Sequence, residues 1–182
     1  SVPRASDPIA HHLRRAADRL LAQRSPALEG DLRDTLGLGR ALSGAGHGMA
    51  GIAAALLGAA RILGEERYLA AARDALGFEH AAYCDRLGTW PDLRSSPRPT
   101  RAMHGLCSGA PGVGLALLRC QGELRHMGSS TDPTLGEDIK RAIGACLARP
   151  PLFRDHLCCG NSAAADLLLE TGRSDCRKAA GA

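Results

Sequence analysis

Three short glycine-rich turns hold the side chains of this sequence that are best suited to metal or acid–base chemistry. Residues 46–51 read Gly-His-Gly-Met-Ala-Gly, residues 107–112 read Cys-Ser-Gly-Ala-Pro-Gly, and residues 158–162 read Cys-Cys-Gly-Asn-Ser. Each turn precedes an apolar segment, so each is expected to open a helix. When His47, Ser108 and Cys159 are aligned as one position, the turns lie 61 and 51 residues apart. This spacing is typical of repeated helical hairpins, whose equivalent turns meet on one face.

A common face would gather Cys107, Cys158, Cys159 and His47 around one centre, although they are far apart in the sequence. Three thiolates and an imidazole are ligands that zinc prefers. Three thiolates alone make a net negative site with one open tetrahedral position, where a substrate sulfur would stay nucleophilic. We therefore predict a zinc site formed by the three cysteines, with thiol activation as its chemistry. The alternative is that the adjacent cysteines are buried apolar residues, but their place at the start of a helix favours the metal site.

The predicted position of Cys158 and Cys159 at a helix N-terminus also bears on their protonation. A helix N-terminus stabilises a thiolate, so we expect a thiol pKa below the usual value of about 8.5. Because zinc binds deprotonated ligands, a preformed anionic site would release fewer protons on binding the metal.

His47 stands between two glycines and is the candidate general acid or base. An imidazole with an ordinary pKa near 6.5 suits proton transfer at neutral pH. A capping or surface histidine is the alternative. His104 and His156 lie near the predicted ligands in the sequence. Either could contact a ligand of the metal or be solvated, and we expect both to be solvated.

Composition limits the classes of function. The 182 residues are enough for one domain, and the few aromatic residues (one Trp, two Tyr and two Phe) favour helices packed through small side chains. The formal net charge of +4 is spread over mixed-sign segments without a basic block, so a nucleic-acid partner is not supported. No apolar run is long enough to span a membrane, and the first residues lack the charged-then-apolar pattern of a signal segment, so we expect neither in this sequence.

The cysteine content favours a reducing compartment. The chain has seven cysteines, an odd number, and two of them are adjacent. A disulfide framework is therefore disfavoured, and we predict a cytoplasmic protein in which cysteines serve a metal site. The remaining cysteines fall on or near predicted helix faces, where burial is the expected role: Cys84, Cys120, Cys146 and Cys176.

Hydrophobic periodicity predicts an all-α fold, an array of helical hairpins with no strand. The helices are expected at about 8–24, 49–63, 69–83, 111–124, 133–147 and 163–170. Asp7-Pro8 and Asp132-Pro133 each combine an N-cap residue with proline at the first helical position. A long loop between about 85 and 110 contains Trp90-Pro91-Asp92-Leu93-Arg94. Trp90 is expected to anchor this loop to the core, and Asp92 and Arg94 could position a peptide backbone.

Five motifs occur in a characteristic order and together resemble one family. They are Gly-x-x-His-Gly-x-x-Gly-Ile-Ala, Glu-Arg-Tyr-Leu, Trp-Pro-Asp-Leu-Arg, Cys-x-Gly-Ala-Pro-Gly and Cys-Cys-Gly-Asn. The pattern resembles the LanC-type lanthionine cyclases, most closely the C-terminal cyclase domain of class II (LanM-type) lanthipeptide synthetases. The resemblance covers about residues 40–172.

The resemblance implies an α/α toroid of seven helical hairpins around zinc, of which residues 1–182 would form a single partial domain. It implies Cys107, Cys158 and Cys159 as zinc ligands and His47 as the acid/base. The implied reaction joins a cysteine thiol to a dehydroalanine or dehydrobutyrine of the same precursor, giving a thioether ring. A dehydrated precursor peptide and the dehydratase half of a synthetase would be the partners.

The sequence departs from the family pattern around the first ligand. Leu106 and Ser108 stand where the family has a tryptophan and a histidine or tyrosine, and Met103 replaces an arginine. These departures, with the small number of readable helices, support a rival hypothesis of a catalytically inactive, zinc-stabilised helical scaffold that binds peptides. An α/α-barrel hydrolase is a weak third hypothesis, because no paired carboxylates stand in the turns.

Overall fold

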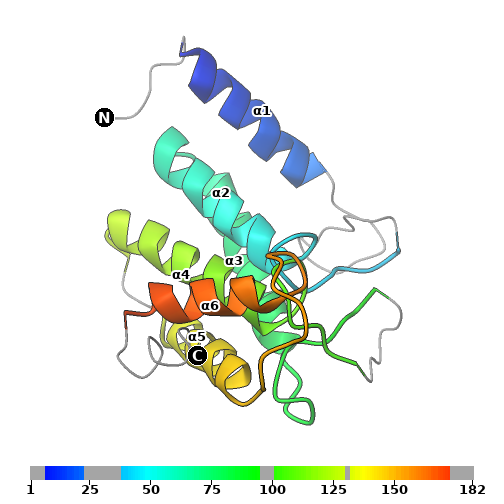
Figure 1. The fold of residues 1–182 in the computed structure, drawn as a ribbon. Coiled ribbons are helices and arrows are strands. Elements are labelled where there is room, and N and C mark those ends of the chain that lie inside the picture. Colours follow the sequence, from blue (N-terminus) through cyan, green and yellow to red (C-terminus); the bar gives the residue numbers. More distant parts are fainter. Residues whose placement is uncertain (1–6, 23–37, 95–100, 130–131, 173–182) are drawn as a thin grey trace.

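The computed structural model describes residues 7–22, 38–94, 101–129 and 132–172, and it contains six helices there (Figure 1). They are α1 (Pro8–Ala22), α2 (Met49–Leu63), α3 (Glu66–Ala81), α4 (Ala110–His126), α5 (Pro133–Leu147) and α6 (Asn161–Glu170). Within these ranges the only β-type pairings are isolated bridges in the loop between α3 and α4. The predicted all-α fold is therefore confirmed.

The helices form two rows. Helices α2, α4 and α6 form the inner row, with α4 at its centre, and α1, α3 and α5 form the outer row. Helix α4 packs against α2 on one side and α6 on the other, while α3 packs on α2 and α5 packs on α4 (Figure 1). Helix α2 is apolar nearly all round and most of its residues are buried, as expected for a helix surrounded by others. The order of outer and inner helices is that of a hairpin array.

Small residues allow the inner helices to approach closely. A Cβ atom at Gly114 of α4 would lie 2.6 Å from the Leu167 side chain of α6 and 2.9 Å from Ala142 of α5. Both distances are shorter than real side-chain contacts, so a side chain at position 114 would have to displace Leu167 and Ala142. The alanine- and glycine-rich composition is thus used where three helices meet.

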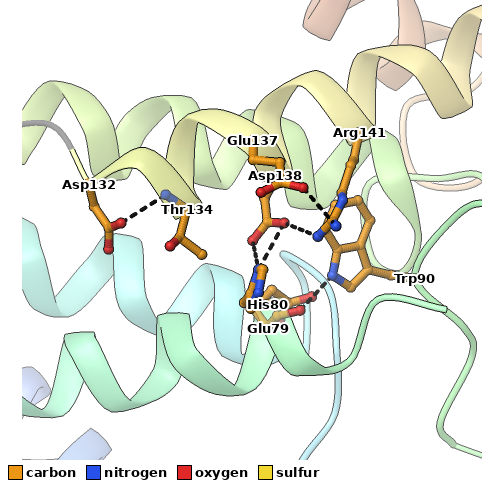
Figure 2. Close-up of polar contacts among 8 residues, drawn as sticks. All are labelled: Glu79, His80, Trp90, Asp132, Thr134, Glu137, Asp138 and Arg141. Atoms are coloured by element: carbon orange, nitrogen blue, oxygen red, sulfur yellow. Dashed lines mark hydrogen bonds and ion pairs between the residues drawn. The ribbon is translucent and has the colours of Figure 1, made fainter. Parts of the chain in front are cut away.

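The predicted start of α5 is confirmed in detail. Asp132 is its N-cap and accepts a hydrogen bond from the Thr134 amide at 2.9 Å, and Pro133 is the first helical residue (Figure 2). A side-chain cap of this kind stabilises a helix by about 1 kcal/mol. It secures the end of the outer helix that packs on α4.

A polar cluster joins α3 to α5 on the outer side of the hairpins (Figure 2). The buried Asp138 carboxylate lies 3.0 Å from His80 Nδ1 and accepts a hydrogen bond from Arg141 at 3.1 Å. The Arg141 guanidinium also stacks over the Tyr83 ring, which meets Trp90 edge-on. Trp90 is fully buried, so it anchors the long loop to the core as expected.

None of the helices in the described ranges is both long and apolar enough to cross a lipid bilayer.

Candidate metal centre

Equivalent backbone hydrogen bonds recur among the three turns, at the spacing expected from the sequence. In the first turn the Gly51 amide donates to the Gly44 carbonyl at 3.2 Å, and 61 residues later the Gly112 amide donates to the Gly105 carbonyl at 3.3 Å. Likewise the Met49 amide donates to Leu42, and the amide of Asn161, 112 residues later, donates to Arg154, both at 2.8 Å. Equivalent turns therefore open α2, α4 and α6.

The three turns lie in direct contact with one another. The Gly46 amide of the first turn donates to the Cys107 carbonyl of the middle turn at 3.2 Å, and the Leu106 amide donates to the Cys158 carbonyl of the third at 2.8 Å. A Cβ atom at Gly46 would lie 3.1 Å from the Cys107 sulfur, and one at Gly105 would lie 2.2 Å from the Cys158 carbonyl oxygen. Glycine is needed at both contacts because the neighbouring turn occupies the space.

This packing brings the three predicted ligands together. Cys107 Sγ lies 3.1 Å from Cys158 Sγ, which lies 3.3 Å from Cys159 Sγ. Cys158 is exposed, while Cys107 and Cys159 are partly buried. The cluster is thus reachable by a substrate that approaches the turns.

The three thiols are donors that suit zinc, but their sulfur atoms lie closer together than the sulfurs of a tetrahedral zinc site. Zinc–sulfur bonds of about 2.3 Å in a tetrahedron separate the sulfurs by roughly 3.8 Å, so the thiols would have to move apart by roughly half an ångström. In accord with this, no group of three or more His, Cys, Asp or Glu in the described ranges has the arrangement of a metal site. Soft thiol donors are nevertheless the type that zinc selects.

The expectation of a lowered thiol pKa at the start of α6 is wrong for Cys159. Its pKa is raised, first by the hydrogen bond with the Cys158 thiol and then by burial, while Arg94 and Arg154 act in the opposite direction. The Cys158 sulfur in contact with Cys159 therefore disfavours a thiolate at Cys159. A bound cation would reverse this balance, because a metal deprotonates its thiol ligands outright.

Arg94, in the long loop, acts electrostatically on the thiol cluster. Asp92 holds it in a two-point ion pair, with Arg94 Nε 2.9 Å from Oδ1 and Nη2 2.8 Å from Oδ2. This pair lowers the pKa of Asp92 and raises that of Arg94, and Cys107 and Cys159 also raise the Arg94 pKa. The pairing of Pro91 with Ala102 brings the motif alongside the segment that leads to Cys107.

The three histidines that lie near the predicted ligands in the sequence or in the turns, His47, His104 and His156, have different environments in the structure. His47 is exposed and follows Gly46, whose amide is bonded to Cys107, so its backbone lies beside the thiol cluster. His156 is also exposed, and its Nδ1 accepts a hydrogen bond from the Cys159 amide at 3.3 Å.

The expectation that His104 is solvated is wrong. Its Nε2 atom is buried and has no hydrogen-bond partner among the described residues. Burial, with a smaller effect of Arg149, lowers its pKa to about 4. The ring faces a cavity of about 570 Å³ between α5, α6 and the loop that joins them, where Gly160 and Asn161 of the third turn also lie.

Sequence reasoning missed Glu79, which supports the first turn from α3. Its side chain is fully buried and accepts hydrogen bonds from Ser43 Oγ, from the Gly44 amide at 3.2 Å and from the Ala50 amide at 3.0 Å. Its burial could have been predicted from the helical periodicity, because Glu79 continues the stripe of buried α3 residues that contains Ala72 and Ala75. A carboxylate on such a stripe must have polar partners in the core.

Among the described residues, the remaining cysteines do not join the cluster. Cys120 is buried in α4, and burial raises its pKa to about 12. Cys84 and Cys146 are partly buried. Cys176 lies outside the described residues.

We expect Gly112→Ala to displace the middle turn. A Cβ atom there would lie 1.8 Å from the Leu106 carbonyl oxygen, one residue before Cys107. Overpacking of this kind costs roughly 2–3 kcal/mol, and we expect zinc binding to weaken as well. Chemical denaturation and a zinc titration measure both effects.

Gly122→Ala is the matched control on the same helix, because a Cβ atom there meets nothing within 4 Å. It should stabilise α4 by up to about 1 kcal/mol and leave zinc affinity unchanged. Equal stability of the two variants would contradict the packing argument.

The comparison with known families agrees with the motifs. A family model described as lanthionine synthetase C-like protein matches residues 5–178, a longer stretch than the motifs span. No curated protein matches the chain significantly. Because the family model covers nearly the whole chain, and because the helices and turns have the order that the family implies, this chain belongs to the LanC-like family of lanthionine synthetases.

Proposed function

We propose that the chain carries out the cyclisation step of lanthipeptide synthesis with zinc bound by Cys107, Cys158 and Cys159. The main support is that three sulfur atoms from two separate turns lie together. Cys107 Sγ is 3.1 Å from Cys158 Sγ, and Cys158 Sγ is 3.3 Å from Cys159 Sγ. Membership of the LanC-like family supports the choice of reaction. The substrate is a dehydrated precursor peptide, and the chain works in the cytoplasm as part of a class II synthetase with a dehydratase half.

The reaction adds the S–H of a peptide cysteine across the carbon–carbon double bond of a dehydrated serine or threonine. Zinc, when bound, would supply charge that keeps the incoming thiol deprotonated near neutral pH. The new bond joins sulfur to the β-carbon, and a proton goes to the α-carbon, so no atom is lost. We assign that proton transfer to His47, which is exposed beside the Cys107 turn.

Arg94 has an electrostatic role in this proposal. Three thiolates on one divalent cation leave a net negative site, which would repel a fourth thiolate. The Arg94 guanidinium, which Asp92 holds in place, interacts favourably with negative charge on Cys107 and Cys159 and so stabilises the thiolates locally. The apolar cavity next to Gly160 could accommodate a side chain of the precursor.

A second candidate function is a zinc-stabilised scaffold that binds the precursor without catalysis. The observation in its favour is that Ser108, which stands where the family has a larger polar ring, is only 5% exposed. The middle turn therefore presents no exposed polar side chain directly after Cys107.

The test is incubation of the zinc-loaded protein with a dehydrated precursor peptide. Cyclisation should remove one free thiol per ring while leaving the peptide mass unchanged, and chelation of zinc should stop it. Free thiols are counted with a thiol-specific reagent, and the mass is measured on the same sample. Unchanged thiols with zinc bound would favour the scaffold, whereas a folded protein that binds no zinc would contradict both functions.

A further inference from the structure

Through its carboxyl group, Glu79 links helix α3 of the outer row to the turn carrying His47. It belongs to α3, and its backbone carbonyl accepts the Trp90 indole N–H at 2.7 Å (Figure 2). Its side chain points the other way, into the first turn, and is fully buried. This placement makes Glu79 a direct connection between the anchor of the long loop and the glycine-rich turn.

The hydrogen bonds of the Glu79 carboxylate bracket His47 along the chain. Before it, Ser43 Oγ and the Gly44 amide donate to Oε1, and after it the Ala50 amide donates to Oε2 at 3.0 Å. The same short segment contains Gly46, whose amide donates to the Cys107 carbonyl at 3.2 Å. One side chain thus holds both ends of the segment that lies against the thiol cluster.

The charges around Glu79 come from two other helices. Asp138 of α5 disfavours a second negative charge there, although His80 and Arg141 pair with Asp138. Cys120 of α4 also interacts electrostatically with Glu79. Burial raises the pKa of Glu79 to about 8, against the hydrogen bonds from Ser43, Ala50 and Gly44 that lower it. The carboxyl therefore changes its protonation in the mildly alkaline range.

We propose that Glu79 is a positioning residue that holds the His47 turn against Cys107 through its bonds to Ser43, Gly44 and Ala50. The role of His47 in this statement rests on the proposed function. Glu79 does not touch the thiols, and it acts only through the backbone that it clamps. Small displacements of an acid/base group reduce the rate of the chemical step more than they weaken substrate binding.

The test compares Glu79→Gln with Glu66→Gln, a substitution of an exposed glutamate on the same helix. We expect Glu79→Gln to lower kcat by about 10- to 100-fold with KM and zinc content unchanged, and Glu66→Gln to change none of them. In NMR spectra, the Gly44 and Ala50 amide signals should shift with an inflection near pH 8 in the wild type and in Glu66→Gln. The inflection should vanish in Glu79→Gln.

A folded Glu79→Gln protein with an unchanged kcat, or with the inflection still present, would overturn the proposal. If Glu79→Gln does not fold, Ser43→Ala removes one bond and keeps the carboxylate. It should shift the Gly44 amide and His47 imidazole signals, and unchanged signals would equally overturn the proposal. If the wild type does not cyclise the precursor, the proposed function fails, while the amide inflection and the imidazole signals still decide whether Glu79 holds the turn.

Discussion

Replacing Cys107 with alanine is expected to abolish both zinc binding and cyclisation. Cys107 supplies the only sulfur of the cluster that does not come from the third turn, and its Sγ lies 3.1 Å from Cys158 Sγ. The two remaining thiols belong to adjacent residues, which leaves zinc with half of its tetrahedral shell from the protein. Zinc content measured on the purified protein should fall from near one equivalent to background, and thiol loss from the precursor should stop.

Cys84→Ala is the control for Cys107→Ala. Cys84 is partly buried in the loop after α3 and has no contact with the sulfur cluster. We expect it to leave zinc content at the wild-type value. Zinc retained at one equivalent in Cys107→Ala would show that the metal binds elsewhere, and the proposed ligand set would then be wrong.

The second large effect is expected from His47→Asn, which should slow cyclisation while leaving zinc in place. General acid–base catalysis by a placed side chain contributes about 100- to 10,000-fold to a rate, and asparagine cannot exchange a proton near neutral pH. His47 is exposed, so the substitution should cost little stability. Rates of thiol loss, with zinc content determined on the same preparation, measure the effect.

His12→Asn on α1 provides the matched control, because His12 is an exposed histidine outside the three turns. It should cyclise at the wild-type rate. A His47→Asn protein that is as fast as the wild type would exclude His47 as the acid/base. A His47→Asn protein that has lost its zinc would instead make His47 a ligand, as the donor set of three thiolates and one imidazole also allows.

Much of the local structure could be predicted because its causes are local. Helix α2 has the predicted bounds, Met49–Leu63, because apolar periodicity and the flanking glycines act over a few residues. Asp132 caps α5 for the same reason. The spacing of 61 and 51 residues indicated equivalent turns, since a repeated unit must present its turns on one face.

The two predictions that were wrong, the solvation of His104 and a lowered pKa for Cys159, concern properties that depend on how the chain packs in three dimensions. His104 lies close to Cys107 in the sequence, yet its Nε2 atom is buried, and the residue lines a cavity formed with α5, α6 and their connecting loop. The Cys159 pKa is raised because packing places Cys158 sulfur 3.3 Å away. Neither environment can be read from a periodic pattern, because desolvation and Coulomb interactions depend on three-dimensional separation.

The sequence by itself determined the all-helical class, the turns and the types of donor that they carry, because propensity, capping and periodicity are encoded locally. Only the tertiary structure decided that the turns touch, that Cys107 and Cys158 sulfurs approach to 3.1 Å, and that the buried Glu79 holds the first turn. The physical reason is close packing, since the glycines at 46 and 105 let one turn approach another and the surrounding helices set the distance.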